Sequence, residues 1–298
     1  QTCYICTQAL HWKTKEGLVR MCACRGTAGF AHVSCLAEQA KILWEEAEEN
    51  NLSDKVTNER FQRWYACSLC EQRYHGVVRC ALGWACWKTY VGRPEADVAR
   101  MSAMTELGNG LNDADHDEDA MSVREAQLSW VRRLGASEYD ILATQGNVAS
   151  TYHKLQRHED ALRTYRDVYS GFLRLRGKEN AETLLAANNY VCCLRRLGHF
   201  AEAKSLLRKM APVARRVFGE GNEITLRMRW NYGQTVKQDP AATLDDLHEA
   251  VTMLEETRRI ARRVLGGAHP FAAEIEKSLQ GLRAALDARE ALEPGDVT

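Results

Sequence analysis

The residues of this sequence best suited to chemistry are the cysteines among its first seventy positions. Seven of the chain's eleven cysteines lie there with one histidine, in four closely spaced pairs: Cys3 with Cys6, Cys22 with Cys24, His32 with Cys35, and Cys67 with Cys70. Two such side chains on a tight turn can close on one ion, and Zn²⁺ takes four thiolate or imidazole donors in a tetrahedron. Eight ligands therefore predict two Zn²⁺ ions in closed, structural sites. The alternatives are a disulfide framework or unrelated buried thiols, and paired spacing with an interleaved histidine favours zinc.

The order of the pairs resembles that of the RING-CH zinc finger, also called the variant RING. The features that match are the one-residue gap in Cys22-Ala-Cys24 and the seven residues that precede His32-Val-Ser-Cys35. The resemblance covers roughly the first quarter of the chain. It implies a cross-brace, in which ligand pairs alternate between two zinc ions. One ion would be held by Cys3, Cys6, His32 and Cys35, and the other by Cys22, Cys24, Cys67 and Cys70.

RING-CH fingers typically act as ubiquitin ligases, so the resemblance implies a ubiquitin-protein transferase without a catalytic side chain of its own. Such a finger holds a ubiquitin-charged conjugating enzyme beside a substrate. Ile5, between the first two ligands, and Trp44, on the segment after Cys35, fit the surface that binds the conjugating enzyme. The alternative for each is ordinary packing within a small domain.

Two features of the finger favour a different function, a non-catalytic protein-interaction scaffold. Glu71 follows Cys70, where active RING ligases often carry a basic residue, and 31 residues separate Cys35 from Cys67. A PHD finger, which reads histone tails, has the same ligand order, and Tyr65 before Cys67 suits it. The one-residue gap between Cys22 and Cys24 and the seven-residue gap before His32 favour a RING-CH finger over a PHD finger.

Composition limits the partners and the compartment. The chain is 45% hydrophobic and 27% charged, and forty basic residues balance forty acidic ones. This balance is that of a globular protein and indicates no nucleic-acid partner. The sequence contains no run of about eighteen apolar residues, so it predicts no membrane span. Thiolates that bind zinc must stay reduced, so we expect an intracellular, reducing compartment, the cytoplasm or the nucleus.

The segments that must position the ligands are helical or aromatic. Residues 36–50 predict a helix with Leu36, Ala40 and Trp44 on one face. Its acidic C-terminal end opposes the helix dipole, so we expect it to be short or frayed. Residues 71–95 are rich in aromatic side chains and predict a packed join. Cys80 and Cys86 within this join are expected to be free thiols.

The rest of the chain repeats itself. The glycine and alanine landmarks recur at a spacing of 42 with a last spacing of 47: Gly135, Gly177, Gly219 and Gly266; Ala161, Ala203 and Ala250. Asn147, Asn189 and Asn231 recur at 42 throughout. Such a period indicates a solenoid of helix pairs. The small alanine lets paired helices approach, and the glycine is expected to end the second helix in the left-handed conformation.

These units resemble the tetratricopeptide repeat in the form found in kinesin light chain. The residues that match include Asn147-Val-Ala149, Arg157-His-Glu-Asp-Ala161 and Leu265-Gly266. In such arrays the first helices line a groove that holds an extended peptide or protein segment. The resemblance implies that role for Asn147, Asn189 and Asn231, and the alternative is that they bond to neighbouring helices.

The sequence therefore predicts a mostly α fold, a small two-zinc cross-brace finger followed by an α-solenoid of helix pairs. We expect the finger at residues 1–75, the aromatic-rich join at 76–95, the repeat array with its capping helix at 96–290, and a tail at 291–298.

Overall fold

The computed structural model describes residues 1–298 apart from 21, 23, 25–27, 267–268 and 292–298. The chain is mostly α, and the described residues contain no strand, only isolated bridges between Val19 and Ala31 and between Ala66 and Arg73. It forms two compact units, residues 1–155 and 156–298. No helix in the described part of the chain is long and apolar enough to cross a membrane.

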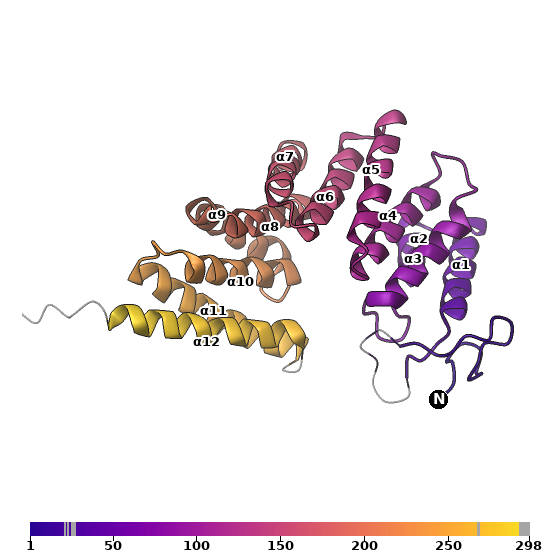
Figure 1. The fold of residues 1–298 in the computed structure, drawn as a ribbon, viewed down its shortest axis with the longest axis horizontal. Coiled ribbons are helices and arrows are strands. Elements are labelled where there is room, and N and C mark those ends of the chain that lie inside the picture. The colour runs from indigo at the N-terminus through magenta and orange to yellow at the C-terminus, as the bar shows by residue number, and fades with distance from the viewer. Residues whose placement is uncertain (21, 23, 25–27, 267–268, 292–298) are drawn as a thin grey trace, which may run out of the picture. The chain divides into compact units, whose positions relative to one another are not determined.

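The first unit contains the zinc-ligand segments and a set of helices, of which Figure 1 labels α1 to α6. The helices are α1 (Val33–Glu49), α2 (Asp54–Phe61), the short 3₁₀ helix η1 (Gln62–Trp64), α3 (Gly76–Tyr90), α4 (Val98–Asp113), α5 (Asp117–Arg133) and α6 (Glu138–Lys154). Helices α4 and α5 pack against each other.

The helix expected to be short or frayed is complete. Helix α1 runs to Glu49. Two glutamates of its acid-rich C-terminal end form ion pairs with arginines that lie outside the helix. Arg60 forms an ion pair with Glu46 at 2.9 Å, and Arg93 forms one with Glu48 at 2.7 Å. The prediction was wrong because these cations lie far from α1 in sequence.

Helix α3 packs on both sides. Its Val78 and Leu82 belong to the core around the zinc-ligand cysteines, and its Cys86 and Tyr90 join a second core with residues of α1, α2 and α4. None of the eleven cysteines, all of which lie among the described residues, forms a disulfide, so Cys80 and Cys86 carry thiols as expected. The aromatic-rich segment is therefore a structural part of the first unit.

Helices α3 and α4 cross with their backbones in contact. A Cβ atom placed on Gly83 would lie 2.7 Å from the carbonyl oxygen of Glu106, and one on Gly110 would lie 2.7 Å from that of Arg79. Beside this crossing the buried Arg79 guanidinium forms an ion pair with Glu106. Glycine at both positions lets the two helices approach this closely.

The second unit consists of helices that pack against one another in chain order. The helices are α7 (His158–Arg176), α8 (Ala181–Arg196), α9 (Phe200–Phe218), α10 (Glu223–Gln238), α11 (Leu244–Leu265) and α12 (Pro270–Glu290). Neighbours in sequence pack against each other from α7 to α12, and α10 also packs on α8 and α12. Ala161, Ala203 and Ala250 are completely buried, which confirms that small residues sit where paired helices approach.

Gly135 follows α5 in the expected left-handed cap, with φ of 64° and hydrogen bonds from its amide to the Arg132 carbonyl and from the Ala136 amide to the Val131 carbonyl. The other three repeated glycines end the second helices in a conformation different from the expected one. Gly177, Gly219 and Gly266 have φ of 77°, 85° and 88°, but their ψ values are 175°, 169° and 151°. The left-handed helical region has ψ near 47°. These residues instead occupy an extended region that is open almost only to glycine, so the requirement for glycine holds for a different reason.

Candidate functional site: two cysteine and histidine groups

The eight predicted ligands come together in two groups of four. One contains Cys3, Cys6, His32 and Cys35, and the other contains Cys22, Cys24, Cys67 and Cys70. In each group the ligand atoms lie within 4.8 Å of one another. The pairs alternate along the chain between the groups, which is the cross-brace that the RING-CH resemblance implied.

Two of the pairs sit on turns with the same backbone structure. The amide of Thr7 donates to the Cys3 carbonyl at 2.9 Å, and the amide of Glu71 donates to the Cys67 carbonyl at 2.9 Å. Thr7 and Glu71 have positive φ values of 62° and 57°. The residue after each ligand pair therefore turns the chain through the left-handed region. Glu71 occupies this turn position in the second knuckle.

Local structure also positions the other ligands. His32 precedes the first residue of α1, and Cys35 lies in the first turn of that helix. The amide of Ser34 donates to the Glu16 carboxylate at 2.8 Å, which satisfies one of the free donors at the start of α1. Gly29 has φ of 78°, and a Cβ atom there would lie 2.6 Å from Cβ of Cys24. Only glycine fits beside that ligand.

The donor geometry fits zinc and excludes disulfides. Four donors at Zn²⁺ bond lengths lie about 3.8 Å apart for two sulfurs and about 3.5 Å apart for a sulfur and a nitrogen. Sγ of Cys24 and Sγ of Cys67 are 3.8 Å apart, and Nδ1 of His32 lies 3.3 Å from Sγ of Cys6 and 3.6 Å from Sγ of Cys35. A disulfide would need sulfurs about 2 Å apart.

The surroundings of His32 and Cys35 also suit a divalent cation. The other imidazole nitrogen, Nε2, faces the carbonyl of Ala9 at 3.4 Å, which selects the tautomer with Nδ1 free to bind a metal. Burial and the neighbouring thiols raise the pKa of Cys35 to about 12. A bound cation would stabilise the thiolate form. All four donors of each group come from the protein, so these are closed sites that hold structure.

The two residues expected to bind a conjugating enzyme differ in exposure. Ile5 is half-buried and packs against the core of the finger. Trp44 is only 5% exposed, and its ring packs edge-on against Phe61 at 5.0 Å and against Tyr90 at 6.4 Å. The docking role expected for Trp44 is corrected accordingly. It is a core residue, because α2 and α3 cover the apolar face of α1.

Leu69 is a further exposed apolar residue of the finger, which the sequence patterns did not single out. It occupies the same position in the Cys67–Cys70 knuckle as Ile5 does in the Cys3–Cys6 knuckle, and it is 53% exposed. The hydroxyls of Tyr4 and Ser68, each one residue earlier, are 3.0 Å apart. The two knuckles are therefore neighbours. The matching spacing of the two cysteine pairs was the sequence signal that could have found Leu69.

The three repeated asparagines do not share one environment. Asn147 and Asn189 are half-buried on α6 and α8. Asn231 is 1% exposed, and its Nδ2 donates to Oδ1 of Asn188 at 2.9 Å. The groove role expected for Asn231 is corrected. It ties α10 to the preceding first helix, which was the alternative for all three.

Comparison with known families agrees with this geometry. The RING-variant domain family matches residues 3–70, and two tetratricopeptide repeat families match residues 140–212 and 242–271. The match to the RING-variant family favours that finger over a PHD finger. The search against curated proteins matches none of them.

Solved structures resemble the chain in fold. BtubC (BKLC) from P. vanneervenii is 14% identical, with a TM-score of 0.51, and the match covers 90% of this chain and 95% of that one. A putative kinesin light chain from Podosopora anserina with nearly identical TPR-like repeats is 16% identical, with a TM-score of 0.49, over 78% of this chain and 98% of that one. By the family matches, the chain carries a RING-variant domain at residues 3–70, followed by tetratricopeptide repeats.

Proposed function

We propose that this chain is a RING-type ubiquitin ligase in which each cysteine and histidine group holds one Zn²⁺. The observation that carries the proposal is the interleaving of two closed four-ligand groups within residues 3–70, the range that the RING-variant family matches. Zinc in such sites fixes the surface loops of a small domain and leaves no position for a substrate. The finger then acts by positioning its partners.

The reaction itself needs no side chain of the finger. The amine of a substrate lysine attacks the thioester carbonyl that joins ubiquitin to the cysteine of a conjugating enzyme. An amide bond forms, the carbon–sulfur bond breaks, and the enzyme's thiol leaves with the proton. The finger holds the charged enzyme so that the amine meets the thioester at a high effective concentration.

Ile5 and Leu69 are the proposed contacts to the conjugating enzyme. They occupy equivalent positions on neighbouring knuckles, and Leu69 is well exposed. Apolar side chains of this kind form the centre of an interface. Trp44 is not part of this surface because it is buried.

The repeats would select the substrate or partner protein. Asn147 and Asn189 stay proposed contacts to a peptide or protein segment, since both side chains are half-buried on first helices. The domain limits at residues 75, 95 and 290 also stay proposals, as does an intracellular, reducing compartment, in which zinc-binding thiolates stay reduced.

The test is discharge of ubiquitin from a panel of charged conjugating enzymes onto free lysine, with the zinc-loaded chain present or absent. We expect acceleration that is lost in Cys22→Ser and strongly reduced in Leu69→Ala and Ile5→Ala. Val98→Ala is the control, because Val98 is an even more exposed apolar residue, at 68%, and lies on α4 outside the finger. Equal rates for Leu69→Ala and wild type would remove the proposed surface.

A second candidate function is the non-catalytic scaffold. The burial of Trp44 and the acidic residue at position 71 favour it. This candidate predicts that a folded, zinc-loaded chain accelerates discharge from none of the enzymes. Its finger would then bind a partner or serve only as structure, and the repeats would carry the function.

A further inference from the structure

Helix α3 is apolar on nearly every side. Of its fifteen residues only Arg79 and Lys88 are charged, and Arg79 is buried in its ion pair with Glu106. A helix that is apolar all round is normally buried all round. Helix α3 packs against α1 and α4, but its remaining side is open to solvent. This open side is therefore a candidate surface for a partner.

The open side carries five residues in a regular row, which we call the α3 stripe: Val77, Ala81, Trp84, Lys88 and Val91. Their spacings alternate between four and three residues, as in the seam along which the helices of a coiled coil meet. At about 100° per residue, all five lie within about 80° of one another. Val91 follows the last residue of α3 and keeps the dihedral angles of a right-handed helix. Val77 is 71% exposed, Trp84 43% and Val91 39%.

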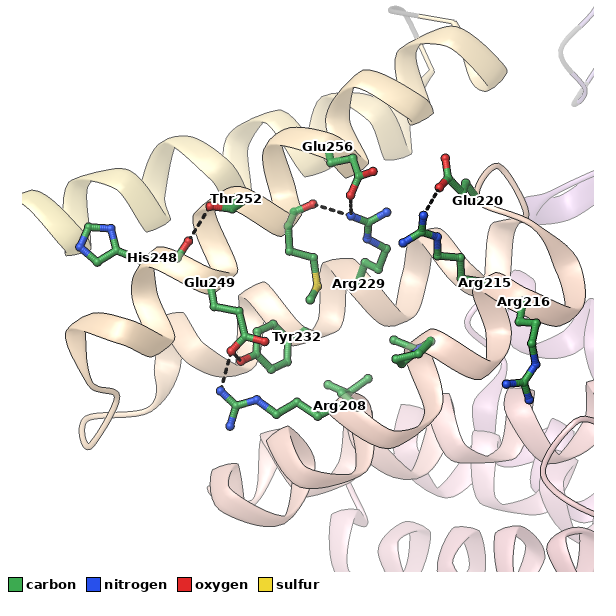
Figure 2. A pocket seen from close by; sticks show the side chains of 14 residues that line it. Arg208, Arg215, Arg216, Glu220, Arg229, Tyr232, His248, Glu249, Thr252 and Glu256 are labelled. Atoms are coloured by element: carbon green, nitrogen blue, oxygen red, sulfur yellow. Dashed lines mark hydrogen bonds and ion pairs between the residues drawn. The ribbon is translucent and has the colours of Figure 1, made fainter.

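Exposed helix sides in the second unit show a more usual composition. Figure 2 shows a groove lined by α9, α10 and α11, where arginines and glutamates point toward one another. Arg208 pairs with Glu249, and Arg215 pairs with Glu220. These charged side chains interact with one another and with water. The α3 stripe differs, because four of its five side chains are uncharged and three of them are bulky and apolar.

The α3 stripe is symmetric about Trp84. Val77 lies seven residues before Trp84 and Val91 lies seven residues after it. Each valine is therefore about 10.5 Å from Trp84 along the helix axis. In a two-fold symmetric interface the same surface of both copies meets itself, so that surface must be complementary to itself. An antiparallel pair of α3 helices, with Trp84 at the two-fold axis, would place each Val77 beside Val91 of the partner.

The one charge of the α3 stripe is compatible with this pairing. Lys88 lies about 6 Å beyond Trp84 along the helix, and Ala81 lies about 4.5 Å before it. Each Lys88 would thus lie over Ala81 of the partner, whose small side chain leaves room for the lysine stem while the ammonium group reaches water. The chain has a formal net charge of zero, so two copies do not repel each other over long range.

We propose that the chain forms a two-fold symmetric dimer through the α3 stripe, with the two α3 helices antiparallel and Trp84 at the axis. An aromatic residue at the centre of an interface commonly contributes much of its binding free energy. One pair of helices of this length buries no more than about 1,200 Å², the low end for specific interfaces, so the dimer is weak and reversible. The proposal rests on α3 and does not depend on ligase activity.

Sedimentation velocity of the full, zinc-loaded chain tests the dimer. We expect a reversible monomer–dimer equilibrium with a Kd of about 10–100 μM. Trp84→Glu should raise the Kd at least about 10-fold, because it places two like charges at the axis. Leu185→Glu is the control and should leave the Kd within about 2-fold, because Leu185 is similarly exposed, at 47%, but lies on α8 in the second unit. A wild-type chain that stays monomeric at about 200 μM, or equal effects of the two substitutions, would overturn the proposal.

An exchange of charges tests the antiparallel register and decides the matter should Trp84→Glu fail to fold. Val77→Glu and Val91→Lys should each weaken the dimer about 10-fold, because each places a charge against an apolar side chain. Both suit the helix dipole, so the fold should be kept. The double variant should dimerise at least about 5-fold more tightly than either single variant, because each new carboxylate meets the partner's new ammonium group. Within one chain the two positions are about 21 Å apart, too far to pair. A double variant no tighter than the single ones would refute this pairing.

Discussion

The crossing of α3 and α4 gives a quantitative prediction for Gly110→Ala. The added Cβ would lie 2.7 Å from the Arg79 carbonyl oxygen and 2.9 Å from Cα of Cys80, whereas ordinary contacts begin at 3.4 Å. The obstacle is backbone, so the helices must separate by about 0.7 Å or bend, and overpacking of this kind costs about 1–3 kcal/mol. Alanine gains about 1 kcal/mol over glycine within a helix. We therefore expect a net loss of about 1 kcal/mol in the free energy of unfolding.

Gly281→Ala on α12 is the matched control. The nearest atoms to its added Cβ belong to the flexible end of the Lys237 side chain, which can move away. This variant should be unchanged or more stable by up to about 1 kcal/mol, because only helix propensity acts. The difference between the two variants isolates the cost of crowding, about 1–3 kcal/mol.

Urea unfolding followed by fluorescence and circular dichroism measures both variants. Six of the seven tryptophans lie in residues 1–155, so fluorescence follows the first unit, while circular dichroism follows the helices of both. The double variant Gly83→Ala/Gly110→Ala should cost less than the sum of the single variants, because one separation of the helices relieves both contacts. A Gly110→Ala chain as stable as Gly281→Ala would refute the backbone contact.

Three further predictions concern the zinc groups, the repeats and acid stability. Cys67→Ser should release zinc from its group and unfold the finger, because a group of three thiolates binds zinc less tightly. Native-state zinc counting checks this, and the helices of residues 156–298 should keep their circular dichroism. Ala203→Trp should lower the melting temperature strongly, since Ala203 is completely buried between paired helices, and an unchanged value would contradict that packing. Burial alone would raise the pKa of Asp246, but hydrogen bonds from Lys204 and Arg208 lower it to about 2. A carboxylate with a lowered pKa stabilises the fold above the unfolded pKa of about 4, so we expect about 2 kcal/mol to be lost as the pH falls from 4 to 2, and Asp246→Asn should flatten that part of a pH-dependent unfolding curve.

The grouping of the zinc ligands and the repeated helix pairs could be predicted because each depends on spacing alone. Two cysteines on a tight turn can bind the same ion whatever the rest of the fold is. A period of 42 residues determines which positions of the repeats are equivalent. The environment of a single residue could not be predicted in this way. Trp44 lies on the apolar face that periodicity indicates, but only the fold reveals that α2 and α3 cover it.

The same distinction explains the asparagines and the end of α1. Asn189 and Asn231 are equivalent in the repeat, yet Asn231 meets Asn188, a contact that the period does not contain. The acidic end of α1 is stabilised by Arg60 and Arg93, which local propensity cannot anticipate. Leu69 could have been found, because its position in the second knuckle repeats that of Ile5 in the first.

Helices α3 and α4 cross at Gly83 and Gly110, and this contact limits where the chain could be joined to a domain from another protein. A chimera that joined the finger to a foreign array directly after residue 75 would lose α3, whose Val78 and Leu82 belong to the core of the zinc-ligand segments. A junction placed between α3 and α4 would need a partner helix with glycine facing the Arg79 and Cys80 backbone. The finger is therefore expected to be inherited together with α3 and α4.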